Sequence, residues 1–562
     1  MIYTSSFRCW GAATAALCLL LQATWVQAQS AAPVAPAAVA DSVPIDVMEF
    51  LVEGNTVLSA VAIETAVTPF LGPKRSVADL DAARAALERA YQTAGYLTVF
   101  VDLPVQKVDD GVVRLKVLEG RIARTSVTGS RYYSQGYIRE KVPTFTEGTV
   151  PNFTVAQTEL ALVNRTEQRR VQPVLKAGKE PGTVEVELKV ADQLPVSGTV
   201  ELNNQHAPDT DPWRIQATLR YDNLFQRDHG ISLTATVAPR KPSQATAVVL
   251  NYSVPQDNGN TLIGYAVSSN SEVQTFGGTS VLGNGTTLGV RYAIPFTGRG
   301  DGSAYHSLTV GVDYKDLSEK VLFGGDTIST PLRYLPFQAN YSGNWNDKDA
   351  QTSVTATVIA ASRALLKRSV SCPGSAEPVD QFACKRFGAD GSFASLRLGG
   401  RHSRSVGPVQ VAVKFASQLA SQQLASSEAF SIGGADTVRG YLEGEGSGDQ
   451  GAAGTLEVRS PNLARAVNSM WSLGAAEGAA SGSAFGFSEV TVFAFGDVGR
   501  TQVTQPLPGQ ASRVWLIGTG AGLTLTGRPG WNLGLEWAQA RKPGSVTQTG
   551  DSRFHIRLGL KY

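Results

Sequence analysis

The hydrophobic and polar positions of this 562-residue chain follow two different patterns. Up to about residue 192, helical spacing is mixed with short strands. Beyond it, apolar and polar residues alternate strictly, most clearly in the terminal segment RFHIRLGLKY. Because successive side chains of a strand point to opposite faces, such a segment predicts a strand with one apolar and one polar face. The pattern therefore predicts an N-terminal α+β region followed by a long all-β region.

The N-terminal region begins with the element order β-α-α-β-β. Its expected elements cover residues 46–53, 59–70, 76–94, 96–103 and 112–118. Ser76 and Asp79 have the spacing of a capping box at the start of the second helix, and Gly95 is placed to end it. The first strand runs into a turn at Gly54.

The same order of elements repeats 75 residues further along the chain, where Gly129 corresponds to Gly54. Thr154 and Gln157 are the expected caps of the repeat's second helix. A single larger α+β domain is the alternative to an internal repeat. The repeat predicts two modules, which cover residues 45–120 and 121–192.

The all-β region, residues 193–562, has the pattern of a transmembrane barrel. WRIQATLRYDN, HSLTVGVDY, VQVAVKF and WNLGLEW alternate, and Gly-, Asn-, Asp- and Ser-rich turns separate such segments. A soluble sandwich of this size would need apolar residues that fill one very large core, but the second face of these strands holds Gln, Arg, Asp, Thr and Lys. A barrel explains both faces, because its apolar face meets lipid outside and its polar face meets water inside. The region has room for about sixteen strands. Phe554 and Tyr562 then lie on the apolar face of the closing strand.

The overall charge and the apolar segments of the chain limit its class and location. The 50 Lys and Arg balance 48 Asp and Glu, so no overall charge indicates nucleic acid as a partner. Residues 1–28 are typical of a signal peptide cleaved after Ala28, with a signal anchor as the alternative, and residues 29–44 form a Pro/Ala-rich linker. No later run of about 18 apolar residues is available for a membrane helix, so only a closed barrel would span a bilayer.

Cys372 and Cys384 are the two cysteines left after signal cleavage. In an oxidising compartment a pair this close predicts a disulfide that closes a loop. A metal site would need further ligands, and no other Cys or His follows before His402.

Catalytic motifs are scarce. The five histidines form no HExxH, and no G-x-S-x-G or phosphate-binding loop is present. GSGDQG fits G-x-G-x-x-G but lacks a βαβ setting and is typical of a flexible turn. We therefore expect no enzyme, no cofactor and no metal site, although scattered residues that form a composite active site stay open as an alternative.

One loop, around residues 425–455, is rich in glycine and yet carries apolar side chains that a solvated loop does not need. In the strand VTVFAFGDVGR, Phe493, Phe495 and Asp497 share one face, which indicates that this inner face is covered. A shielded charge requires a partner. We expect the loop to fold into the barrel and Arg439 to pair with Asp497; two unrelated surface charges are the alternative.

These features together resemble the two-partner secretion transporters, the TpsB or haemolysin-activator family within the barrel superfamily that includes BamA. The resemblance rests on TVRGY after SIGGAD, FAFGDVG, the terminal aromatic residue and the two modules, and it covers nearly all of the mature chain. It implies two periplasmic α+β POTRA (polypeptide-transport-associated) domains followed by a 16-stranded antiparallel transmembrane β-barrel in the Gram-negative outer membrane.

The resemblance also implies a site. The family's inward-folded loop carries a V-R-G-Y/F motif, which falls here on Val438, Arg439, Gly440 and Tyr441. Its arginine meets an inner-strand aspartate, Asp497, and Phe493 and Phe495 would support that face. Some members also have a plug helix before a long linker. Residues 29–44 do not suffice for both, so we expect the inward loop to be the main occlusion.

The implied function is type V protein secretion. A large β-rich exoprotein, an adhesin or cytolysin, would be held at its N-terminal secretion domain by the POTRA modules and exported without ATP. The barrel assembly machinery would insert the barrel into outer-membrane lipid. A BamA-like insertase is the alternative, although such relatives commonly carry more than two POTRA domains. A passive porin and an outer-membrane hydrolase are further alternatives.

Overall fold

The computed structural model describes residues 44–208, 210–271, 283–297, 303–323, 326–372, 375–386, 388–473, 486–528 and 530–562. The predicted signal peptide and the predicted linker up to residue 43 lie outside these ranges. Two compact units divide the chain, one ending at Gly120 and one beginning at Arg121. No helix within the described ranges is long and apolar enough to cross a membrane.

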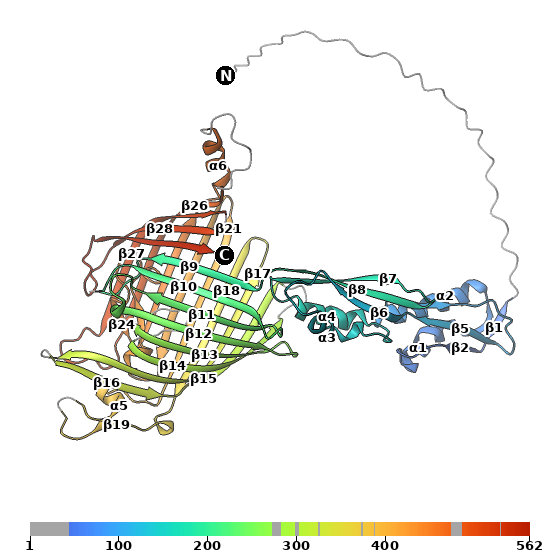
Figure 1. The fold of residues 1–562 in the computed structure, drawn as a ribbon, viewed down its shortest axis with the longest axis horizontal. Helices are drawn as coiled ribbons and strands as arrows, with labels where there is room; N and C mark the ends of the chain where they lie inside the picture. The colour runs from blue at the N-terminus through green and yellow to red at the C-terminus, as the bar shows by residue number, and fades with distance from the viewer. Residues whose placement is uncertain are drawn as a thin grey trace, which may run out of the picture. The chain divides into compact units, whose positions relative to one another are not determined.

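The first unit contains one α+β module (Figure 1). In its main sheet β5 lies between β2 and β4, parallel to β2 and antiparallel to β4. Leu80 of α2 packs with Val113 of β5 in the core. The elements are β1 (Ile45–Val47), β2 (Glu49–Glu53), α1 (Ala60–Val67), η1 (Thr68–Phe70), β3 (Gly72–Arg75), α2 (Val77–Thr93), β4 (Val99–Asp102) and β5 (Val112–Glu119).

The capping box predicted for the second helix is confirmed. The Ser76 side chain accepts from the Asp79 backbone, and the Asp79 side chain accepts from the Ser76 backbone. The predicted first strand differs, because it breaks at Met48 into β1 and β2. β1 pairs with β3, a strand that its Gly- and Pro-containing sequence does not predict.

A second module opens the second unit and repeats the first. In its sheet β8 lies between β6 and β7, parallel to β6 and antiparallel to β7. Gly54 and Gly129 both have positive φ, and a Cβ would lie 2.5 Å from the carbonyl oxygen of Val117 and 2.3 Å from that of Val190, respectively. The elements are β6 (Arg121–Thr128), α3 (Gln135–Glu140), η2 (Pro143–Phe145), α4 (Phe153–Val163), β7 (Arg169–Ala177) and β8 (Thr183–Asp192).

The cap expected for the repeat's second helix was wrong. Asn152, not Thr154, is the N-cap, and its side-chain oxygen accepts from the backbone N–H groups of Thr154 and Val155. Asparagine is among the strongest capping residues, and here it begins the helix ahead of the threonine.

A closed antiparallel barrel forms the rest of the second unit (Figure 1). β16 and β17 pair in succession with β15 and are two halves of one stave, so the seventeen strands make sixteen staves. The strands are β9 (Val196–Asn203), β10 (Arg214–Leu224), β11 (His229–Val237), β12 (Ala245–Pro255), β13 (Thr261–Ser271), β14 (Gly283–Thr297), β15 (Ala304–Phe323), β16 (Asp326–Tyr334), β17 (Pro336–Asn346), β18 (Ala350–Ala361), β21 (Phe393–Val406), β22 (Val409–Ala420), β25 (Gln450–Arg459), β26 (Phe487–Gln502), β27 (Arg513–Gly527), β28 (Trp531–Ala540) and β29 (Ser552–Lys561).

Short elements lie in the connections between the staves. They are η3 (Pro242–Gln244), η4 (Arg363–Leu365), β19 (Ser369–Val370), β20 (Val379–Asp380), α5 (Gln381–Lys385), η5 (Ser426–Glu428), β23 (Phe430–Ile432), β24 (Gly446–Gly448) and α6 (Ala464–Leu473).

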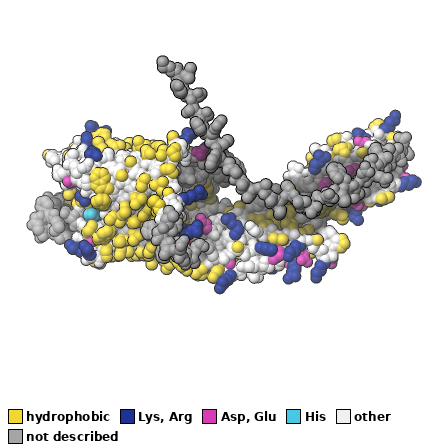
Figure 2. Space-filling view, turned by 90° about the horizontal axis from the view of Figure 1, so that it is seen from above, with side chains coloured by type: hydrophobic (Ala, Val, Ile, Leu, Met, Phe, Trp, Pro, Cys, Tyr) yellow, Lys and Arg dark blue, Asp and Glu magenta, His cyan; other side chains and the backbone are white. Residues whose placement is uncertain are grey.

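The outer face of the barrel is apolar. Leu219, Leu233 and Leu250 are register partners on β10, β11 and β12 and are 59%, 46% and 42% exposed. Figure 2 shows the resulting belt of hydrophobic side chains over the barrel. A soluble protein rarely leaves so large an apolar surface exposed, whereas the hydrocarbon core of a bilayer would cover it.

The terminal strand closes the barrel, as its alternation predicts. β29 pairs with β28 on one side and with β9 on the other. Phe554 and Tyr562 are exposed on the outer face, and His555 is buried on the inner face.

The second module is tied to the barrel by a buried ion pair. Arg169 of β7 donates two hydrogen bonds of 2.8 Å to Asp228 in the β10–β11 turn, and both side chains are almost fully buried. Tyr137 donates to the same carboxylate over 3.2 Å. Lys141 and Asp257 form a second pair between module and barrel, but Asp257 is largely exposed.

We expect Asp228→Ala to loosen this joint, because a buried guanidinium left without its partner costs about 3–5 kcal/mol. Hydrogen–deuterium exchange should rise in residues 130–137 while the barrel strands stay protected. Asp257→Asn is the matched control, since an exposed pair contributes only about 0–1 kcal/mol. Equal exchange in the two variants would contradict a structural role for the buried pair.

Candidate functional site

The connection between β22 and β25, residues 421–449, is called here the inward loop. Strand directions alternate from β9, which leaves the second module, so this loop belongs to the barrel end opposite that module. It carries η5, β23 and β24. Ile432, Val438 and Tyr441 are at most 1% exposed and pack with Leu516 of β27 and Ala540 of β28. The loop therefore lies on the inner wall of the barrel.

Arg439 is fixed to Asp497 of β26 by three hydrogen bonds. Its Nε and Nη2 donate to the two carboxylate oxygens over 2.7 and 2.9 Å, and its backbone N–H donates over 3.0 Å. Asp497 is 1% exposed and Arg439 is 6% exposed. A bidentate guanidinium–carboxylate pair is the most directional ion pair available to side chains, so it fixes the orientation of the loop as well as its position.

Further lumenal side chains surround this pair. Nη1 of Arg439 donates to Glu536 of β28 over 2.9 Å and lies 3.7 Å from Glu457 of β25. The guanidinium carbon lies 3.3 Å from the centre of the Phe495 ring. The phenyl face and the carboxylates together replace the water that the guanidinium gives up.

The neighbouring motif residues make their own contacts with the wall. Gly440 has φ +94° and donates its N–H to Nε2 of His555 over 3.2 Å. The Tyr441 hydroxyl lies 3.0 Å from the carbonyl of Ile517 and 2.7 Å from that of Lys542. Each residue of the motif thus has a different function in seating the loop.

Glycines in the barrel wall allow the loop to approach. A Cβ at Gly518 of β27 would lie 2.0 Å from the carbonyl oxygen of Arg439, and one at Gly499 of β26 would lie 2.7 Å from Cγ2 of Val438. Real Cβ atoms do not come so close, so both positions require glycine while the loop is seated.

Two more carboxylates of the inward loop are clamped to the barrel. Glu428 accepts from Lys315 over 2.5 Å, Tyr334 over 2.7 Å and Arg397 over 3.1 Å. Burial opposes its ionisation, but Lys315 and Arg397 outweigh burial and hold the pKa of the Glu428 carboxyl below its ordinary value. Glu445 accepts from the backbone and hydroxyl of Thr547, in the β28–β29 connection.

The structure brings most of the sequence-predicted site residues into one cluster. Val438, Arg439, Gly440, Tyr441, Asp497 and Phe495 meet, and Phe493 lies beside Phe495 with the Arg459 guanidinium 4.4 Å from its ring centre. Phe554 and Tyr562 lie apart, because they face outward.

Sequence reasoning missed Glu536, His555, Glu428, Glu445 and Asp449. Glu536 could have been predicted from the sequence, because it is the one carboxylate on a lumenal face that otherwise holds Asn532, Gly534 and Ala538. The three acids of the inward loop carried none, because acidic residues in a glycine-rich loop are also typical of a solvated turn.

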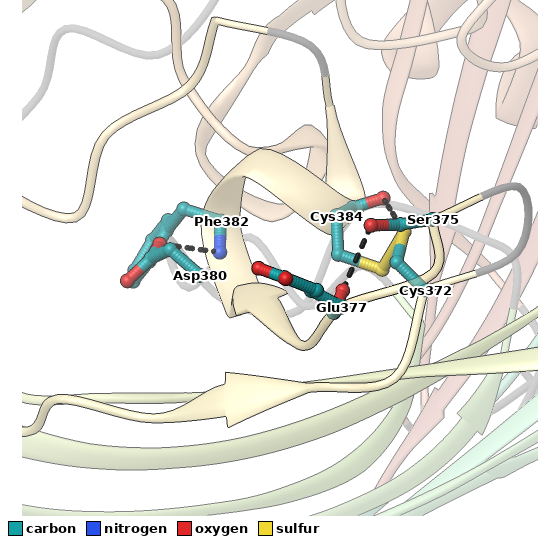
Figure 3. Close-up of a disulfide and its surroundings, with 6 residues drawn as sticks. All are labelled: Cys372, Ser375, Glu377, Asp380, Phe382 and Cys384. Carbon is teal, nitrogen blue, oxygen red and sulfur yellow. Dashed lines mark hydrogen bonds between the residues drawn. A yellow bond between two sulfur atoms is a disulfide. The ribbon is translucent and has the colours of Figure 1, made fainter.

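The disulfide predicted from sequence spacing is present in the structure, between Cys372 and Cys384 (Figure 3). It lies in the β18–β21 connection, which shares the barrel end of the inward loop, and Cys384 is part of α5. It makes no contact with Arg439 or Asp497. Among the described residues, no group of three or more His, Cys, Asp or Glu side chains is arranged to hold a metal ion.

A lipid-facing barrel with an inward loop clamped to its wall, preceded by two β-α-α-β-β modules, defines a POTRA-bearing polypeptide-transport barrel. The model of the ShlB-type POTRA domain matches residues 45–120, and that of the haemolysin secretion/activation protein ShlB/FhaC/HecB matches residues 182–525. The second match covers more than half of the chain, so the chain belongs to the ShlB/FhaC/HecB family.

Known relatives agree with this assignment. The outer membrane transporter CdiB of Escherichia coli strain 536 is 26% identical over 236 residues, which are 41% of this chain and 39% of that protein. The solved structure of CdiB from Escherichia coli covers 94% of this chain and 93% of its own, with 17% identity and a TM-score of 0.59. BamA from Haemophilus ducreyi lacking POTRA domains 1–3 covers 92% of this chain and all of its own, with 12% identity and a TM-score of 0.53. At these identities the two structures show the fold alone.

Family membership gives the location and the broad class. The barrel lies in the outer membrane, and the POTRA region lies in the periplasm. The inward loop therefore belongs to the extracellular end of the barrel. Members of the family are transporters, which agrees with the expectation that the protein is not an enzyme.

We expect Arg439→Ala to release the inward loop while the barrel stays folded. Breaking a buried pair leaves Asp497 uncompensated at about 3–5 kcal/mol, whereas the sixteen-stave hydrogen-bond network is untouched. Arg439→Lys should release it partly, because an ammonium does not bind bidentately. Protease cleavage within residues 433–444 of the purified barrel measures release, and heat-modifiable migration in gels reports folding.

Lys414→Gln is the matched control for these variants. Lys414 is an exposed lumenal cation that binds the same loop, through the carbonyl of Asp436 over 2.6 Å. A loop that is cleaved equally in Lys414→Gln and Arg439→Ala would contradict a special role for the arginine.

Proposed function

We propose that this protein is a two-partner secretion transporter that captures one large β-rich exoprotein in the periplasm and exports it through its barrel without ATP. The observation that carries the proposal is the inward loop, which the buried Arg439–Asp497 pair seats against the barrel wall at β26. Arg439 and Asp497 keep the loop in its working position during export.

Capture begins at the POTRA modules by β-augmentation, in which an extended segment of the exoprotein's N-terminal secretion domain adds to a sheet edge. Edges of the second module are covered. Pro173 removes a donor from β7, and Ile122 of β6 exchanges backbone hydrogen bonds with Gly148 and Thr149.

The first module is better suited to accept a strand. On one side of its sheet the Gln106 side chain donates to the carbonyl and accepts from the N–H of Arg114, which covers β5 beyond the end of β4. No comparable cover is found along the outer edge of β2 in the described part of the chain, and β2 contains no proline. We therefore place first contact with the exoprotein at β2.

Export then needs no nucleotide. The captured segment passes through the lumen in an extended form, and folding of the exoprotein outside makes the step irreversible, because folded β-structure does not re-enter the barrel. The barrel assembly machinery inserts the barrel itself into outer-membrane lipid, through the terminal strand that carries Phe554 and Tyr562.

We expect deletion of the gene to remove one large protein from the culture medium while the other outer-membrane barrels stay at their normal level. Quantitative mass spectrometry of medium and outer membranes, with the native strain as reference, makes this measurement. Complementation with Arg439→Ala should restore the barrel to the membrane and leave export impaired, and complementation with Lys414→Gln should restore both.

Two outcomes would contradict the proposal. A joint fall of many barrel proteins would favour the BamA-like insertase, which shares the fold. Export that is undiminished with Arg439→Ala would remove the inward loop from the mechanism.

A further inference from the structure

Another buried carboxylate, Asp449, ends the inward loop and joins three extracellular connections of the barrel. Asp449 is fully buried. Arg386, in the β18–β21 connection, donates to its two oxygens over 2.5 and 3.0 Å. The backbone N–H of Leu424 donates over 2.9 Å, and that of Thr504, in the β26–β27 connection, over 2.7 Å. We call Asp449 and Arg386 the outer clasp.

Arg386 is held in place by the segment before it. Gln381 of α5 is 1% exposed and pairs with the main chain of Arg333 in β16, donating over 2.7 Å and accepting over 2.8 Å. Phe382 is equally buried, and its ring centre lies 5.5 Å from that of Tyr334. The disulfide with Cys372 also joins Cys384 of α5 to the segment that precedes the helix (Figure 3). Arg386 follows this helix directly, so the contacts of α5 fix the position from which Arg386 reaches Asp449.

The three connections also hold one another around the clasp. Nη1 of Arg386 donates to the carbonyl of Leu424 over 2.8 Å. The Gln423 side chain donates to the carbonyls of Thr504 and Gln505 over 2.6 and 2.9 Å. Gly388 has a positive φ, and a Cβ there would lie 2.1 Å from the Gln423 oxygen. The three connections therefore form one packed layer at the outer end of the lumen.

The outer clasp is separate from the Arg439 cluster. Asp449 binds groups from the β18–β21 and β26–β27 connections, whereas Arg439 binds Asp497, Glu536 and Glu457 on β26, β28 and β25. The two sets share no side chain. Breaking one of them removes no side chain from the other.

We propose that Asp449 and Arg386 are positioning residues that keep the extracellular mouth narrow, and that they hold the inward loop independently of the Arg439–Asp497 pair. The role of the outer clasp in export rests on the proposed function, whereas the narrowing of the mouth is a property of the barrel alone. The outer clasp opens for the passage of the exoprotein, and the Arg439–Asp497 pair keeps the loop in the lumen while it does so.

Conductance of the purified full-length protein in planar bilayers tests the proposal without any exoprotein. A pore conducts according to its narrowest section, so Arg386→Gln and Asp449→Asn should each raise the mean conductance by about twofold or more. The two changes combined should raise it no further than either alone, because both remove one contact. Arg386→Gln combined with Arg439→Ala should exceed both single variants.

Arg363→Gln is the matched control. Arg363 lies in the same extracellular connection, but its guanidinium is 3.9 Å from the Asp390 carboxylate and both side chains are about half exposed. The conductance of Arg363→Gln should therefore equal that of the native protein. Heat-modifiable migration confirms that each variant is folded. Native conductance in folded Arg386→Gln and Asp449→Asn would overturn the proposal, as would additive effects of the two. Either result would leave the export assignment standing, because export is measured separately in cells.

Discussion

The buried pair of Arg439 and Asp497 is the interaction on which the position of the inward loop depends. A loop rich in glycine loses much conformational entropy when it is ordered, and this cost offsets part of what the packing of Ile432, Val438 and Tyr441 contributes. A guanidinium that is 6% exposed changes this balance. It has lost its water, and only the carboxylates and the Phe495 ring at this one place on the wall replace it. The loop is therefore held in one register rather than in many similar ones.

The wall is shaped to match. Gly499 and Gly518 lie where the inward loop comes closest to the wall. The rings of Phe495 and Phe493 lie against the guanidinium groups of Arg439 and Arg459, respectively. These residues break the polar pattern expected of a water-filled lumen on β26 and β27.

Most of the fold follows from residue periodicity. Lipid and water impose opposite requirements on the two faces of every strand, so the alternation of WRIQATLRYDN or RFHIRLGLKY predicts both the barrel and the direction of its side chains. Asp497 could be predicted for the opposite reason, because FAFGD breaks the alternation. Glu428, Glu445 and Asp449 could not, since their partners come from strands and connections that only the closed barrel brings near. β3 was missed because its sequence, GPKR, has no alternation of apolar and polar residues, and it is a strand only because it lies beside β1.

Under the proposed function, an exported chain would also pass the wall formed by β10 to β18. Thr218 faces Thr234 across β10 and β11 with their hydroxyl oxygens 3.0 Å apart, and Asn340 donates to Thr357 across β17 and β18 over 2.6 Å. Where this wall does carry a strong charge pair, as at Arg291 and Asp313, the two side chains are buried on each other at 2.7 Å. Between such pairs, which include Arg220 and Asp222 on β10, the hydroxyls and amides are neutral, and each offers only a weak net hydrogen bond in competition with water. Where the inward loop meets charged side chains, as Arg439 does at Asp497 and Glu428 at Lys315, the charges are already paired. Under the proposed function, the lumen therefore binds its own loop more firmly than a transported segment.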